Sequence, residues 1–390
     1  MWQYAARCLR LQGYLESPGE GRQEPRIPAR VLLGSLLLGR LLRESSFLAI
    51  EAWVRSPARR ALSVPPRFGD DSLAYFPERW QAPVTGQALA GALRPAKRNK
   101  AFDDSRFLGL AVDGTTGGRR SPQSNPWKWC RPCGQQGTVF GYRHHLAMSS
   151  VVGTGLTLPW DVEPYGPGDS EYAAALRLLR PAGGSLGVRF ADYVVADGEY
   201  ARAPFLPAAG ELGLRVLVRL KANLPELLEA AQRRFADPPA PRVFFQDGDR
   251  VELGDADDFD PWETLRWKTV RVLRYRPGKP NGELVEAFWL TDFSSRRVGS
   301  RELYGLAQTR WEIEKQGFKD AQNRYGLEHL CPHHPNSMLG VWLITLLAML
   351  IERLYRLRHL HRGTPPLRTA IELLRLLRQG LCSVPLTDTS

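Results

Sequence analysis

Two short apolar runs in this chain each stop at an aspartate that is followed by glycine. Residues 107–112 precede Asp113, and residues 193–196 precede Asp197. A short apolar run that meets a turn residue indicates a buried β-strand. In open α/β sheets, ligands bind at the carboxyl ends of the strands. The two runs therefore favour an α/β fold that carries Asp113 and Asp197 at strand ends.

A third acidic residue lies far downstream, in a stretch with helical character. Ser300 is a helix-capping residue type, and the helix that it opens is predicted to run to about residue 323. Arg310 and Glu314 share one face of this helix at the i, i+4 spacing, whereas Glu312 lies on nearly the opposite face. Two carboxylates from strand ends and one from a helix can hold two divalent metal ions about 3.5–4 Å apart for in-line attack on a phosphodiester.

Each of these carboxylates also has a simpler explanation when it is taken alone. An aspartate before glycine is often only a turn residue. Glu314 can be a solvated helix residue that pairs with Arg310. The three residues in this order, with their neighbours, favour metal-dependent phosphoryl transfer over those separate explanations.

At these positions the chain resembles the bacterial insertion-sequence transposases of the DDE superfamily, in the cut-and-paste branch with a Tyr-Arg-Glu-Lys signature. The resemblance covers residues 20–350 approximately. It rests on Asp113-Gly114-Thr115, Ala196-Asp197-Gly198, Arg310-Trp311-x-Ile313-Glu314 and Tyr325-Gly326-Leu327-Glu328-His329. Ala307 and Ala321 stand where the signature has its tyrosine and lysine, and the nearest substitutes, Tyr304 and Lys319, are out of register.

The resemblance implies a site, a cofactor and partners. Asp113, Asp197 and Glu314 would be the catalytic residues and would hold two Mg²⁺ ions, for which Mn²⁺ can substitute. The DNA partners would be the terminal repeats of the element and a target DNA, bound by a homodimer. The DNA-contacting residues implied by the resemblance and by their charge or ring type are Arg310, Lys319, Arg324 and Trp267.

Trp267 enters because cleavage in this branch passes through a DNA hairpin in which an insertion-domain tryptophan holds a flipped base. Trp262 and Trp289 lie in the same basic, tryptophan-rich stretch. Stacking of a base on an exposed ring contributes about 1–3 kcal/mol. Packing within the insertion is the alternative explanation for each tryptophan taken alone.

The expected fold is α/β, with an RNase-H-like catalytic core that is interrupted by a β-rich insertion and preceded by a helical N-terminal domain. The predicted divisions are a helical DNA-binding region at 1–100, the first part of the core at 101–225, the insertion at 226–299, the second part of the core at 300–362, and a C-terminal helix and tail at 363–390.

The charge of the chain agrees with a nucleic-acid partner. The formal net charge is +12, and an excess of this size implies attraction to a polyanion, most often nucleic acid. The alternative is a basic protein from an arginine-rich proteome. A cluster formed by Arg94, Lys97, Arg98 and Lys100 ends the N-terminal region, where it suits contact with a DNA backbone or belongs to a small helical lid.

The remaining sequence patterns give weaker indications of structure and function. Five cysteines do not indicate a disulfide framework. Cys130 and Cys133 have the spacing of a zinc half-site, and Cys331 with its neighbours at 329–334 could form the other half, but a loop and a helix boundary are favoured.

The acidic stretch 255–260 is expected to be a solvated loop. The chain opens without a signal-peptide pattern, and its longest apolar run, 341–350, is too short for a bilayer, so a cytoplasmic protein without a membrane partner, nucleoid-associated when bound to DNA, is expected.

Two other functions remain open. One is a DNA-binding protein of transposase descent that no longer cuts, which the missing tyrosine and lysine keep under consideration. The other is a nuclease that cuts DNA without strand transfer. A role outside nucleic acids has little support, because the chain has no Gly-rich phosphate loop and no serine-nucleophile motif.

Overall fold

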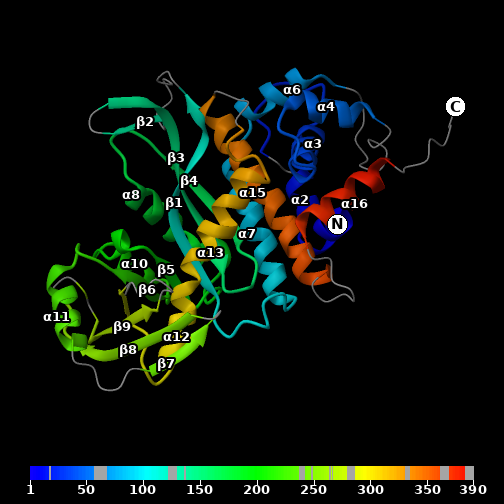
Figure 1. Ribbon diagram of the computed structural model, residues 1–390. Coiled ribbons are helices and arrows are strands. Elements are labelled where there is room, and N and C mark those ends of the chain that lie inside the picture. The colour runs from blue at the N-terminus through cyan, green and yellow to red at the C-terminus, as the bar shows by residue number, and fades with distance from the viewer. Residues whose placement is uncertain are drawn as a thin grey trace.

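The computed structural model describes residues 1–16, 19–56, 68–121, 130–135, 138–236, 242–246, 249–262, 265, 267–278, 286–329, 334–360 and 369–382. Figure 1 shows one long helix, α15 (Pro335–Tyr355), near the middle of the molecule, with a large sheet on one side and the N-terminal helices on the other. The predicted α/β class is confirmed.

The described part of the first hundred residues is helical. Its helices are α1 (Trp2–Cys8), α2 (Leu11–Glu16), α3 (Ala29–Leu41), α4 (Phe47–Arg55), α6 (Asp70–Tyr75), a 3-10 turn (Phe76–Glu78) and α7 (Pro83–Arg98). The Ser46 side chain caps α4 by accepting a hydrogen bond from the Ala49 N–H at 3.1 Å. Helices α3 and α7 both pack against α15, which joins this helical region to the rest of the core.

The sheet is built around β1 (Gly109–Ser121). On one side of β1, β3 (Thr138–Val152) and then β4 (Leu158–Tyr165) pair in antiparallel fashion, and β2 (Cys130–Gln135) also pairs with β3. On the other side, β5 (Tyr193–Ala196) and β6 (Arg215–Leu220) run parallel to β1. Strands β3 and β4 form a hairpin through the turn at residues 153–157. This arrangement is consistent with the RNase-H-like core that the resemblance implies.

The later strands extend the same sheet. They are β7 (Arg242–Gln246), β8 (Asp249–Phe259), β9 (Val270–Pro277) and β10 (Ala287–Thr291), and β10 joins them to β6 by antiparallel pairing. The expectation of a solvated acidic loop at 255–260 is wrong for 255–259, which belong to β8. Asp255 is held there by the buried Arg271, whose Nε lies 2.7 Å from its Oδ1.

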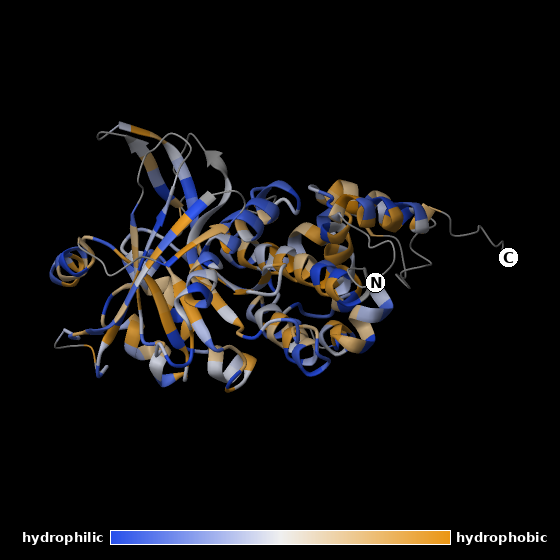
Figure 2. Cartoon of the chain, turned by 60° about the horizontal axis from the view of Figure 1, so that its bottom comes forward, coloured by the Kyte–Doolittle hydropathy of each residue, from blue (hydrophilic) through white to orange (hydrophobic). Residues whose placement is uncertain are grey.

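The helices of the sheet domain complete the core. They are α8 (Glu171–Leu179), α9 (Ala182–Leu186), a 3-10 turn (Gly198–Tyr200), α10 (Phe205–Glu211) and α11 (Pro225–Ala236). Figure 2 shows apolar residues running along the strands in the middle of the sheet. Because these strands are buried on both faces, they read in the sequence as continuous apolar runs.

The helix predicted over residues 300–323 is present, with a change of winding in its middle. It consists of α12 (Ser300–Gln308), α13 (Arg310–Glu312), a π-helical segment (Ile313–Phe318) and α14 (Lys319–Asn323). After α15 the chain continues into a second π-helical segment (Arg356–Leu360), and α16 (Ala370–Cys382) is the last described helix.

One described helix, Pro335–Arg358, is long and apolar enough to cross a membrane by length and composition. In the structure, however, 94% of its most apolar window is buried inside the protein. Its neighbours are α3, α7, α14 and β4. The apolar character of this helix is therefore explained by its place in the core.

Asp161 in β4 gives the fold a pH-dependent stability. Burial raises the pKa of this carboxyl from 3.8 to about 7, although the Val162 N–H donates to it at 2.8 Å. Since the folded state then holds the proton more tightly than the unfolded state, this stabilisation is complete below about pH 4 and is lost as the pH rises through 7. We expect Asp161→Asn to raise the melting temperature more at pH 8 than at pH 5, measured by thermal unfolding. An equal shift at both pH values would contradict this assignment.

Candidate active site

Asp113 and Asp197 lie side by side on neighbouring strands. The parallel register pairs Ala111 with Val195, and Asp113 and Asp197 each follow two residues further along the chain. Asp197 follows the last residue of β5, as predicted. The expectation that a strand also ends at Asp113 is wrong, because β1 continues to Ser121 and keeps its ladder with β3 there.

Arg310 links the first aspartate to the downstream helix. Its Nη1 lies 3.1 Å from Asp113 Oδ2, and its Nη2 lies 2.7 Å from Glu314 Oε1. The Arg310 side chain is 9% exposed, and that of Glu314 is 42% exposed. The arginine thus holds two carboxylates from distant parts of the sequence together, while Glu314 faces the solvent side of the cluster.

Asp197 has a different cationic partner, Lys221, which sequence reasoning missed. The Lys221 ammonium donates to Asp197 Oδ2, and Asn223 donates to the Gly198 carbonyl oxygen at 2.9 Å. The other oxygen, Asp197 Oδ1, is buried and has no hydrogen-bond partner in the part of the chain that the structure describes. Lys221 directly follows β6, so a sequence signal existed: it leaves the same edge of the sheet as Asp197.

The two aspartates have opposite electrostatic environments. Burial raises the pKa of Asp113 to about 7, and the charges of Glu171 and Glu314 add to this effect, against the opposing effect of Arg310. Burial also acts to raise the pKa of Asp197, but the hydrogen bond from Lys221, the backbone N–H of Gly198 and the charges of Lys221 and Arg310 together outweigh it and lower that pKa. The cluster therefore contains one carboxyl that ionises reluctantly and one that ionises readily.

Glu171 is a fourth carboxylate beside Asp113. It accepts hydrogen bonds from Tyr200 Oη at 2.7 Å and from Tyr165 Oη at 3.2 Å. A Cβ atom at Gly114 would lie only 1.9 Å from Glu171 Oε2, so a larger residue at that position would displace the Glu171 carboxylate. In the sequence, Glu171 reads as an ordinary acidic residue in a first helical turn, which gave no reason to place it in the site.

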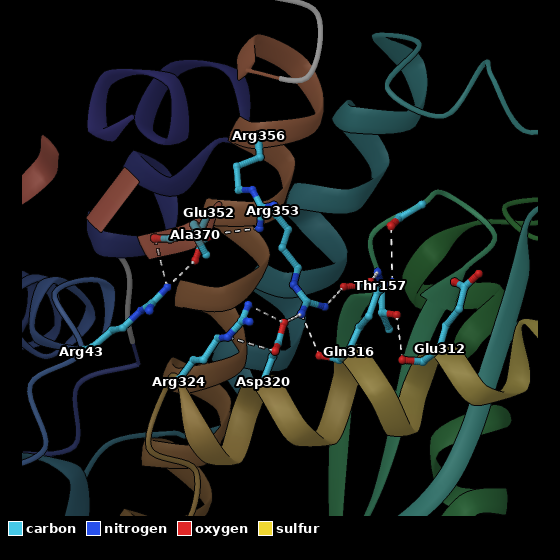
Figure 3. A network of polar contacts seen from close by, with 11 residues as sticks. Arg43, Thr157, Glu312, Gln316, Asp320, Arg324, Glu352, Arg353, Arg356 and Ala370 are labelled. Carbon is cyan, nitrogen blue, oxygen red and sulfur yellow. Dashed lines mark hydrogen bonds and ion pairs between the residues drawn. The ribbon is translucent and has the colours of Figure 1, made fainter. Parts of the chain in front are cut away.

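The opposite face of the active-site helix is fixed to the turn between β3 and β4. Glu312 Oε2 accepts from the Gly153 N–H at 3.0 Å, and Gln316 Oε1 accepts from the Thr157 N–H at 3.0 Å. Figure 3 shows Thr157 beside Gln316, with its hydroxyl donating to the Glu312 carbonyl oxygen at 3.1 Å. Glu312 therefore has a structural partner and points away from Asp113, as its helical position predicted.

Arg353 of α15 completes this anchor. Its side chain is buried and donates to the Thr157 carbonyl, to the Gln316 carbonyl at 2.7 Å and to Asp320 Oδ2 at 2.6 Å (Figure 3). The Gln316 carbonyl belongs to the π-helical segment that also carries Glu314. Single π-turns inside α-helices occur frequently at functional sites. The anchor thus fixes the segment that aims Glu314.

The other residues implied as DNA contacts have different surroundings. Lys319 is exposed. Arg324 pairs with Asp320 at 3.3 Å and is 44% exposed. Trp267 is partly buried and packs against the core. Trp289 is fully buried, with its ring centroid 6.1 Å from that of Trp311, which leaves it no surface for a DNA base.

The carboxylates fit divalent metal ions by their chemistry. Oxygen-only ligands suit Mg²⁺ and Mn²⁺, and the unpartnered Asp197 Oδ1 is a free ligand atom. Within the described residues, no three His, Cys, Asp or Glu side chains lie close enough together to hold an ion. The Arg310 guanidinium lies between Asp113 and Glu314 instead, so it supplies the positive charge there.

The zinc alternative stays a hypothesis, whereas the loop favoured for Cys130 and Cys133 is wrong. Cys130 and Cys133 belong to β2, and Cys133 Sγ donates to the Gly141 carbonyl at 3.2 Å. Cys331 and His333 lie outside the described residues.

No curated protein matches this chain significantly. Among solved structures, the cryo-EM structure of a piggyBac transposase synaptic complex with hairpin DNA matches with a TM-score of 0.41 and 12% sequence identity, over 90% of this chain and 70% of that chain. A family model described as "Transposase DDE domain" matches residues 104–351. Because this match covers more than half of the chain and includes Asp113, Asp197 and Glu314, the protein belongs to the transposase DDE domain family.

Proposed function

We propose that the protein is an active DNA transposase that cuts element ends and joins them to target DNA. The observation that carries the proposal is the contact of Arg310 with both Asp113 and Glu314, beside Asp197, inside the family match. Phosphoryl transfer requires positioning and charge stabilisation more than covalent chemistry by the protein. A cluster of carboxylates and cations at the carboxyl end of a buried strand meets that requirement.

Asp113, Asp197 and Glu314 would hold two Mg²⁺ ions, with Mn²⁺ as a substitute. When bound, the ions activate the attacking oxygen and stabilise the leaving oxygen. Arg310 keeps Asp113 and Glu314 together and partly neutralises their negative charge. Its guanidinium is also suited to contact a DNA phosphate. Lys221 fixes the orientation of Asp197 by holding Oδ2, which leaves Oδ1 as the ligand atom.

The finer assignments follow the resemblance. We infer an insertion-sequence element of the Tyr-Arg-Glu-Lys branch, with Lys319, Arg324 and Trp267 as further DNA contacts and a homodimer on the DNA in the cytoplasm. We also keep the division into a DNA-binding region at 1–100, a core at 101–225 and 300–362, an insertion at 226–299, and a C-terminal helix and tail at 363–390. Terminal repeats and target DNA are the substrates in this proposal.

Metal removal gives the first test. Wild-type protein is incubated with end-labelled DNA that carries the flanking ends of the element and with a supercoiled target plasmid, in Mg²⁺, in Mn²⁺ or in excess chelator. We expect cutting and joining in both metals and neither in chelator, because the carboxylates alone cannot stabilise the charge that develops on the phosphodiester oxygens. Products are separated on denaturing gels.

The same gels separate the alternatives. Binding without cutting in either metal would favour the DNA-binding protein that has lost cleavage. Cutting without joined products would favour a nuclease. Cutting that persists in chelator would contradict the metal-dependent mechanism itself.

A further inference from the structure

A cavity lined by basic residues lies at the opposite end of β5 from Asp197. It has a volume of about 700 Å³ and is bordered by the carboxyl-terminal half of α7, the turn after α1 and the loop between α9 and β5. Its charged lining residues are Arg10, Arg94, Lys97, Arg98 and Arg189. None of its lining residues among those described is acidic.

The four arginines of this cavity have free charges. All four side chains are exposed, and none forms an ion pair with a carboxylate within the ranges that the structure describes. Arg94 and Arg98 are four residues apart on α7, where like charges repel and destabilise the helix slightly. Asp192, which lies close in sequence, accepts a hydrogen bond from the Leu108 N–H at 2.9 Å, and the lining residue on which its charge acts is Lys97. The cluster therefore has uncompensated positive charge that an anion would neutralise.

The backbone holds two of these arginines in an uncommon conformation. Arg10 and Arg189 have φ values of 59° and 63°, in the left-handed region that long side chains rarely adopt. Such conformations cost free energy and persist where the surrounding structure imposes them, often at binding sites. Both residues border this cavity, and glycine would relieve the strain at either position but would remove the charge.

Lys97 has a structural role in the cavity, so the arginines are the residues that would contact a ligand. Its ammonium donates to the carbonyls of Arg189 at 2.8 Å and of Phe190, and it lies 5.1 Å from the centre of the Phe190 ring. The lysine therefore fastens the loop before β5 to α7. A site for a small molecule has buried polar groups that orient its ligand, whereas exposed arginines around a rim are typical of contacts to a nucleic-acid backbone.

We propose that this cavity binds the sugar-phosphate backbone of a DNA duplex, away from the phosphodiester that reacts. Between Phe190 on its rim and Asp197 lie Ala191, Asp192 and the four residues of β5, and β5 alone spans about 13 Å. The segment bound there positions the duplex and carries no sequence information. This inference rests on the proposed function, because it takes DNA as the substrate of the protein.

The test compares two double variants that remove the same charge. Arg94→Ala with Arg98→Ala empties part of the cavity rim, and Arg233→Ala with Arg375→Ala removes exposed arginines of α11 and α16 that also have no described carboxylate partner. Affinity for a labelled duplex is measured in chelator at several salt concentrations. Each lost phosphate contact lowers the slope of log affinity against log salt by about 0.9, so we expect a decrease of about 1.8 for the cavity variant and no change for the control.

Other results would overturn the proposal. Equal decreases of the salt slope in both double variants would indicate general charge attraction. An unchanged salt slope in the cavity variant would mean that DNA does not bind at this cavity. If wild type binds tripolyphosphate and the cavity variant loses that binding with an unchanged DNA slope, the cavity is a small-polyanion site instead. Binding is measured in chelator, separately from cutting. If the expected salt slopes are found but the protein never cuts DNA in either metal, only the proposed function is contradicted. A wild type that does not bind DNA fails both.

Discussion

Asp113→Asn, Asp197→Asn and Glu314→Gln are each expected to lower metal-dependent DNA cleavage by about a thousandfold or more. Losing a metal-binding carboxylate removes several kcal/mol of transition-state stabilisation, and about 4 kcal/mol corresponds to a thousandfold change in rate. Binding of uncut DNA should stay near the wild-type level, because the amides keep the size of the carboxyl groups. Single-turnover cleavage and duplex binding are measured side by side for each variant.

Glu312→Gln is the matched control, two residues from Glu314 on the same helix. Its amide oxygen can still accept the hydrogen bond from the Gly153 N–H that Glu312 accepts at 3.0 Å, so the anchor stays in place and cleavage should be close to that of the wild type. Loss of cleavage in this variant with full activity in Glu314→Gln would mean that the third carboxylate had been assigned to the wrong glutamate.

The melting temperature of Asp113→Asn, measured without metal, tests the role of Asp113 independently of cleavage. Asp113 lies in a site that raises its pKa to about 7, chiefly through burial, so ionising it at pH 8 costs folding free energy. Asp113→Asn should therefore melt no lower than wild type at pH 8, even though it cannot cut. A variant that lost both activity and stability would leave the functional role of Asp113 unsupported.

The parts of the fold that local sequence determines were predictable. The runs before Asp113 and Asp197 indicated buried strands because strands covered on both faces are continuously apolar. The helix from Ser300 followed from capping and periodicity, and the i, i+4 spacing placed Arg310 and Glu314 on one face, where they form an ion pair at 2.7 Å. These features depend on residues within a few positions of one another.

The parts that depend on tertiary partners were not predictable. Glu171 looks like an ordinary surface residue until the fold places it beside Gly114, and the position of Lys221 directly after a strand does not by itself identify Asp197 as its partner. The acidic stretch near Asp255 reads as solvated because its partner, Arg271, is sixteen residues away. The strand through Asp113 continues because β3 supplies hydrogen bonds beyond the glycine, which is long-range pairing that the local pattern does not encode.

The helix predicted from Ser300 also contains a π-helical segment, which is held by a side chain far from it in the sequence. Arg353 takes the Gln316 carbonyl and the Asp320 carboxylate, thirty-seven and thirty-three residues upstream. The arrangement of the active-site helix therefore depends on a core arginine that periodicity assigns only to the basic end of an apolar helix.

Arg353→Leu is expected to lower the free energy of unfolding by about 3–5 kcal/mol, the usual cost of removing one partner of a buried ion pair. The substitution leaves the Thr157 and Gln316 carbonyls and the Asp320 carboxylate without their buried donor. Urea unfolding of Arg324→Leu provides the comparison, because Arg324 pairs with the same Asp320 but is 44% exposed.

The Arg324 variant should lose less than about 1 kcal/mol, as exposed ion pairs do. The Arg353 variant should also cut more slowly per folded molecule at low temperature, because the π-helical segment that aims Glu314 loses its anchor. Equal destabilisation by the two variants would mean that burial does not decide the strength of these contacts. Unchanged cleavage by folded Arg353→Leu would mean that the anchor stabilises the core without positioning the carboxylate.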